Sequence, residues 1–210
     1  MKFKQKKSDI IEDKHLRKKI AVLVIPVIVV VGFAVYAAAS QNTTEPPQSF
    51  VTSRQNLATI SRGIANLNQQ LSAQITTIQN AKKAGDDAKA LATINQAKQT
   101  NAQALQEAES FSSGLQEMSR SLSGFSSTTS QALAARAIAT EISLTSEFIN
   151  YSKLLDNFLT LLGGSVTNDN PTIENKIKAS LDEINKKVDS INSLNQTFLQ
   201  EIGTFDQSLQ

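Results

Sequence analysis

PTIENKIKASLDEINKKVDSINSLNQTFLQEIGTFDQSL, residues 171–209, is the stretch that decides the fold most plainly. Its large apolar residues recur mostly at intervals of three or four, the spacing of one face of an α-helix. Asn170 is a suitable N-cap and Pro171 a suitable first helical residue, so we expect a helix over 171–209. Its apolar face comprises Ile173, Ile177, Leu181, Ile184, Val188, Ile191, Phe198, Ile202, Phe205 and Leu209.

The same spacing runs through three earlier segments, which we expect to form helices over 50–83, 87–122 and 129–162. In the first of them the apolar stripe follows a heptad rule with a single slip. Turn-forming and capping residues separate the segments: Gly85, Asp86 or Asp87, the capping-box pair Thr128 and Gln131, and Gly163-Gly164.

Four such helices joined by short turns predict an all-α fold, a long antiparallel four-helix bundle over residues 50–210. The expected order is up-down-up-down, with coiled-coil-like packing along the stripes. No window alternates with period two over a useful length, so strands are not expected.

The helices expected over 129–162 and 87–122 each leave one question open. The first is apolar over about half of its circumference, wider than a coiled-coil seam. Leu154, Phe158 and Leu161 therefore either fill the core or form a face for a protein partner or for self-association. The polar run at residues 98–103 indicates either a half-exposed stretch or a polar layer or partner groove.

A different pattern occupies residues 20–39, IAVLVIPVIVVVGFAVYAAA, which carry no charge. As a helix they would span about 30 Å, the thickness of the hydrocarbon core of a bilayer. Pro26 and Gly32 are compatible with a membrane helix. We therefore expect one transmembrane helix that contacts the lipid bilayer through residues 20–39.

The flanks of this segment predict its orientation. Residues 1–19 hold seven Lys and one Arg against three acidic residues, and the rest of the chain sums to −3 within an overall +2. By the positive-inside rule the basic tail is cytoplasmic and binds anionic lipid headgroups. A polar, Pro-containing linker at 40–49 then leads to an extracytoplasmic bundle at the plasma membrane. The slightly acidic bundle offers no footprint for nucleic acid.

Cleavage is the alternative to an uncleaved anchor. Ala37-Ala38-Ala39 before Ser40 supplies the small residues that signal peptidase needs, so the bundle could be released after Ala39. The long apolar run and the acidic residues of the tail favour the anchor. Both interpretations place the bundle outside the cytoplasm.

The residue types that carry most enzyme chemistry are scarce. The chain has no Cys, and its single His is His15 in the tail. Thiolate or imidazole metal sites and Ser–His hydrolase sites therefore cannot be built in the bundle. No phosphate-binding or dinucleotide-binding glycine motif is present. We expect no catalytic residues, no metal and no cofactor.

These features favour a non-enzymatic interaction or scaffold protein at the cell surface. Two alternatives remain at this stage. One is a sensor-type ligand-binding bundle that works with a separate signalling partner. The other is a secreted helical effector or adhesin released by cleavage near Ala39.

Overall fold

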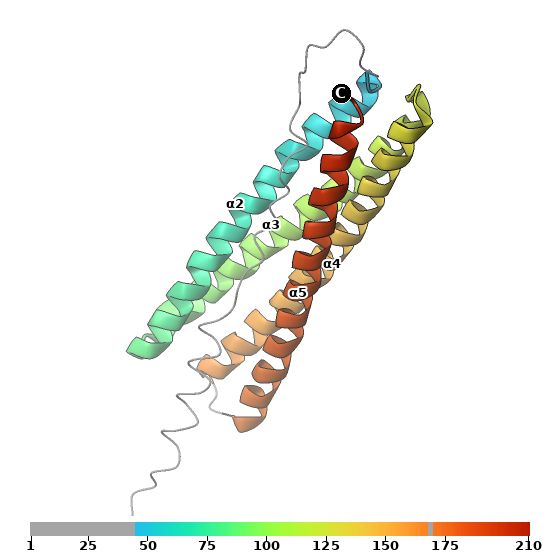
Figure 1. Cartoon of the computed structure of the whole chain (residues 1–210). Coiled ribbons are helices and arrows are strands. Elements are labelled where there is room, and N and C mark those ends of the chain that lie inside the picture. The colour runs from blue at the N-terminus through green and yellow to red at the C-terminus, as the bar shows by residue number, and fades with distance from the viewer. Residues whose placement is uncertain (1–44, 168–169) are drawn as a thin grey trace, which may run out of the picture.

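The computed structural model describes residues 45–167 and 170–210, which form four long α-helices and one short 3-10 helix. The long helices are α2 (Gln48–Ala84), α3 (Asp87–Arg120), α4 (Thr128–Thr167) and α5 (Pro171–Gln207), and η1 (Ser121–Gly124) follows α3. They lie side by side and alternate in direction, with the C-terminus close to the start of α2 (Figure 1). The described residues contain no strand, so the predicted all-α four-helix bundle is confirmed.

Among the described helices, none combines the length and the apolar character needed to cross a lipid bilayer. The predicted membrane segment at 20–39 and the basic tail lie outside the described residues. So do residues 40–44 of the predicted linker at 40–49, whose last two positions belong to α2.

Three predicted helix ends are confirmed by their capping geometry. Gly85 follows α2 in the left-handed conformation, with φ 72°, which glycine adopts without steric cost. The Asp86 carboxylate accepts a hydrogen bond from the Lys89 amide and so caps α3. The Asn170 side chain accepts one from the Thr172 amide ahead of α5.

The start of α4 differs by one residue from the capping box predicted at Thr128 and Gln131. The hydroxyl of Ser127 accepts a hydrogen bond from the Ser130 amide, and the Ser127 carbonyl accepts one from the Gln131 amide. Ser127 is therefore the capping residue. The sequence Ser-Ser-Thr-Thr offers several similar hydroxyls, so the spacing alone did not distinguish Ser127 from Thr128.

The predicted end of α4 at residue 162 was wrong, because the helix continues through Gly163-Gly164 to Thr167. A helical glycine costs only about 1 kcal/mol relative to alanine. The added turn is anchored by Val166, which packs against the core, and by Ser165, whose hydroxyl accepts a hydrogen bond from Lys82 Nζ. These contacts offset the poor helix propensity of the two glycines.

Close packing between backbones joins α2 to α3, α3 to α4 and α4 to α5. Helices α2 and α5 are less closely packed, and Figure 1 shows them near each other at the C-terminal end and apart at the other end. Where they meet, Phe50 and Phe205 lie with ring centroids 5.5 Å apart. Arg54 forms a bidentate pair with Asp206, at 2.8 and 2.9 Å.

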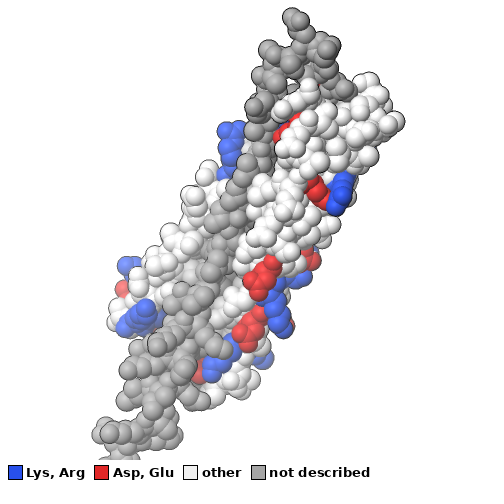
Figure 2. All heavy atoms as spheres, in the orientation of Figure 1, with Lys and Arg blue, Asp and Glu red and all other residues white. Residues whose placement is uncertain are grey.

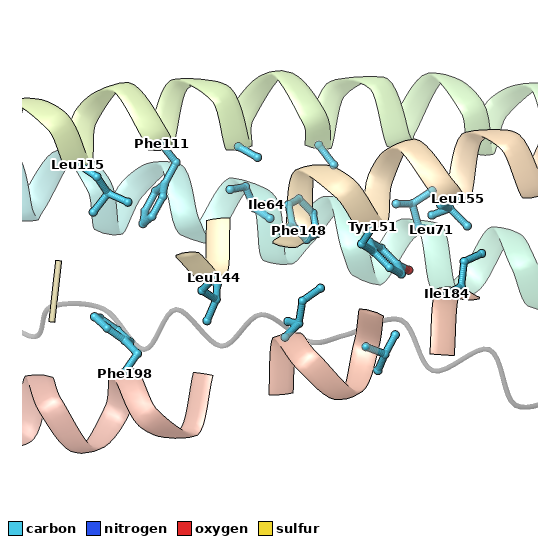
Figure 3. Close-up of a cluster of buried hydrophobic side chains, with 14 of the residues drawn as sticks. Ile64, Leu71, Phe111, Leu115, Leu144, Phe148, Tyr151, Leu155, Ile184 and Phe198 are labelled. Atoms are coloured by element: carbon cyan, nitrogen blue, oxygen red, sulfur yellow. The ribbon is translucent and has the colours of Figure 1, made fainter. Parts of the chain in front are cut away.

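The core is built from rows of residues spaced by seven along each helix (Figure 3). In α2 one row holds apolar residues and the neighbouring row holds Arg54, Ser61, Asn68 and Ile75, all buried. The single slip predicted in the heptad spacing of this helix is absent. The buried row stays regular, because the polar residues Ser61 and Asn68 occupy positions that a count of apolar residues alone leaves out. The apolar row of α2 is Phe50, Leu57, Ile64, Leu71 and Ile78.

Two glycines inside helices test this packing. A methyl group on Gly203 of α5 would contact nothing, so Gly203→Ala should raise the free energy of unfolding by about 1 kcal/mol through helix propensity. A methyl group on Gly114 of α3 would lie 2.8 Å from Cδ2 of the buried Leu57. Gly114→Ala should therefore lower stability by roughly 1–2 kcal/mol. Urea denaturation measures both, and equal stabilisation by the two variants would contradict the α2–α3 packing.

Candidate functional site

The most unusual feature of the bundle is the set of polar side chains at core positions. Each long helix contributes at least one to its seven-residue rows. They are Arg54, Ser61 and Asn68 of α2, Thr93, Thr100 and Asn101 of α3, Ser130, Glu141, Thr145 and Ser152 of α4, and the partly buried Asn195 of α5. Since buried polar groups destabilise a core unless they are paired, their partners indicate what each one does.

At one end of the bundle the polar group is Arg54, whose side chain is only 8% exposed. Besides its bidentate pair with Asp206, its guanidinium lies 5.8 Å from the centre of the Phe205 ring. Phe125 completes an edge-to-face cluster with Phe50 and Phe205. The arrangement ties α2 to α5 and covers the end of the core, which is a structural role.

A second polar group lies between α3 and α4. Asn101 donates a hydrogen bond from Nδ2 to the carbonyl oxygen of Ser152 at 2.7 Å. The preceding residue of α3, Thr100, is also buried, and its hydroxyl accepts a hydrogen bond from Gln74 Nε2 of α2 at 3.0 Å. Of the two alternatives for residues 98–103, a polar layer is therefore present, although Gln99 and Gln103 on the outer face are exposed.

Glu141 is the third polar group, and both of its carboxyl oxygens lack a hydrogen-bond partner. It is 0% exposed. Burial raises the pKa of Glu141 from 4.5 to about 8, because the apolar surroundings disfavour the charged form. Among the described residues it is the single fully buried acid.

Tyr151 lies ten residues further along α4 and is also fully buried. Its ring stacks on Phe148 with centroids 5.9 Å apart, and its hydroxyl has no hydrogen-bond partner. Burial raises the pKa of the Tyr151 hydroxyl, which therefore stays neutral. The sequence did not reveal Glu141 as a core residue, since the periodicity was judged on apolar residues; Tyr151 belongs to the apolar stripe, but its unpaired hydroxyl is seen only in the structure.

The three residues predicted to form a partner face, Leu154, Phe158 and Leu161, differ in their exposure to solvent. Phe158 is 0% exposed and fills the core. Leu154 and Leu161 are partly buried and pack against the core from its edge. A surface contact at this place can involve only the two leucines.

A groove of about 610 Å³ lies between α4 and α5 on the described surface. Its floor includes Ile142, which at 38% is the exposed large apolar residue of the described chain. Serines dominate the rest of the lining: Ser143, Ser146, Ser190 and Ser193, with Glu147 and Leu194 at the edges. The ionisable side chain in this lining is Glu147, which is paired with Lys187.

The charged side chains pair with one another across the helices. Lys187 donates to Glu147 at 2.6 Å and Arg136 to Glu201 at 2.6 Å, both between α4 and α5. Figure 2 shows acidic and basic side chains next to each other over much of the visible face. Within residues 45–167 and 170–210, no three His, Cys, Asp or Glu side chains gather as a metal site would require.

Comparison with protein-family models, with curated proteins and with solved structures gives no match for this chain.

The unpaired Glu141 makes stability depend on pH. In the unfolded chain the carboxyl loses its proton above pH 4.5, whereas the folded chain keeps it up to about 8. Between these two pH values the folded chain therefore binds one proton more than the unfolded chain. The contribution of Glu141 to the free energy of unfolding is fully present below pH 4.5. It is lost as the pH rises towards 8, at roughly 1.4 kcal/mol per pH unit.

Glu141→Gln removes this titration without changing the shape of the side chain. The difference in urea-unfolding free energy, variant minus wild type, should grow from pH 4.5 to about 8 and then level off. Glu147→Gln, which alters a partly exposed ion pair on the same helix, is the matched control and should show no such growth. Parallel stability curves for wild type and Glu141→Gln would show that the carboxyl is not buried.

Proposed function

We propose that this protein is a membrane-anchored, extracytoplasmic helical-bundle protein that acts as a non-enzymatic interaction or assembly module at the cell surface. The proposal combines the architecture of the described bundle with the uncharged segment at 20–39 and the basic tail before it. The anchor fixes one end of a long rigid rod, whose sides are then presented to other proteins.

The observation that carries the proposal is that polar and charged side chains of the bundle bind neighbouring helices. Arg54, Asn101 and Glu147 each bind a neighbouring helix, and Glu147, which also lines the groove between α4 and α5, is paired with Lys187 of α5. Side chains used in this way hold helices in register, which is the requirement of a scaffold. The partly buried Leu154 and Leu161 at the core edge are the apolar groups that we propose for a protein partner or a second copy.

Topology is tested by labelling single cysteines in intact cells, since the chain has no native Cys. Ser72→Cys lies on the exposed side of α2 and should react with a membrane-impermeant maleimide from outside. Ser8→Cys in the basic tail is the matched control and should react only after lysis. Labelling of Ser72→Cys only after lysis would refute an extracytoplasmic bundle.

The same preparation tests anchorage through the mass of the mature chain. An intact N-terminus in the membrane fraction supports the uncleaved anchor. A chain that begins at Ser40 in the medium would instead support the secreted effector or adhesin.

The interaction role is tested with a photoreactive amino acid placed at Leu161 in intact cells. A discrete crosslinked product is expected there, either with another protein or with a second copy. The exposed polar position Gln116 on α3 serves as the control and should give none. Equal, diffuse crosslinking at both positions would contradict a specific face on α4.

A further inference from the structure

Glu141 lies on the buried face of α4. It belongs to the row of α4 residues spaced by seven, which is buried throughout and otherwise apolar: Ala134, Phe148, Leu155 and Leu162. On one side of this row Ser130 contacts Ser208 of α5, and on the other Thr160 accepts a hydrogen bond from Lys98 of α3. The row between these two therefore faces the centre and, across it, α2.

A second unpaired acceptor lies near this level. Asn195 occupies a core position of α5, and its Oδ1 is buried without a hydrogen-bond donor. The ion pairs Arg136–Glu201 and Lys187–Glu147 fix the register of α4 against α5 on either side. Position 195 then lies within about one helical turn of the level of Glu141.

Charged groups on the surrounding helices do not neutralise the Glu141 carboxyl. Those near its level lie at exposed or partly exposed positions, and the buried Arg54 nearer the end of the bundle is bound to Asp206. These side chains are Arg62 of α2, Glu107, Glu109 and Glu117 of α3, Asp189 and Glu201 of α5, and Arg136 and Glu147 of α4 itself. An ionised Glu141 could gain stabilisation only from water.

The seam between α2 and α5 is where water can enter most easily. These two helices are the least closely packed neighbours around the bundle, and they are not joined to each other by a turn. They can therefore separate without strain in any connecting loop. The Arg54–Asp206 pair and the Phe50–Phe205 contact hold one end, so separation would begin at the other end.

We propose that Glu141 is a protonation-controlled latch: the neutral carboxyl lets the four helices close, and its ionisation parts α2 from α5 so that water reaches the bundle axis. The carboxyl gives its proton to water or hydroxide, and the carboxylate gains the hydration that the closed core denies it. Parting would uncover apolar rows of α2 and α5 over part of their length. The proposal concerns the folded bundle and does not depend on its location or on the proposed partner.

The latch is tested by the distance between spin labels on α2 and α5 in the full chain. Asn66→Cys and Asn192→Cys place the labels at exposed positions, one on each helix. At about pH 6 we expect one short-distance population, because the carboxyl is neutral. Towards about pH 9.5 a longer-distance population should grow while the helical circular dichroism signal stays constant.

Glu141→Gln in the same labelled chain should keep the short distance at every pH. Glu141→Leu, which matches the leucines of its row, is a second neutral variant in case the glutamine side chain disturbs folding. Glu147→Gln is the control and should open like the parent chain.

Three results would overturn the proposal. A distance that does not change with pH would show that ionisation does not part the helices. A change that persists in both neutral variants would assign it to another group. Loss of helical signal together with the distance change would mean global unfolding and not a latch.

Discussion

The constraint on which the structure depends is that at least two rows of residues, each spaced by seven, must be buried along every one of four helices. Isolated helices of this length gain little stability from propensity, and most of it comes from the packing of these rows. Once one helix is placed, the spacing fixes which face of the next can meet it. Helix direction, turn position and register follow from that condition.

The polar residues in these rows reduce the apolar area that the core buries. In return they distinguish one register from another, because a shifted helix would leave Arg54 without Asp206 or Asn101 without the Ser152 carbonyl. Glu141 has no such partner, so it adds no register-specific contact. An unpaired buried carboxyl does not stabilise the core. The presence of Glu141 at this position is therefore better explained by its ability to gain and lose a proton.

The sequence predicted the class, the order of helices and three helix ends, since stripe spacing, Gly85, Asp86 and Asn170 act locally. It did not predict the continuation of α4 past Gly163-Gly164, because the contact of Ser165 with Lys82 joins distant parts of the chain. It also missed the polar core positions outside residues 98–103. Ser61 and Glu141 look like solvent-facing residues until the neighbouring rows show that their phase along the helix is that of the core.

The most direct test of this register is the carbon-13 NMR titration of the Glu141 side-chain carboxyl, assigned by its loss in Glu141→Gln. A slip of one residue in α4 would turn Glu141 by about 100° and carry it away from the bundle axis. The account predicts a neutral carboxyl at pH 7 and a titration displaced from 4.5 towards about 8. A carboxyl that titrates near 4.5 would show that Glu141 lies in water, and the assignment of core rows in α4 would be wrong.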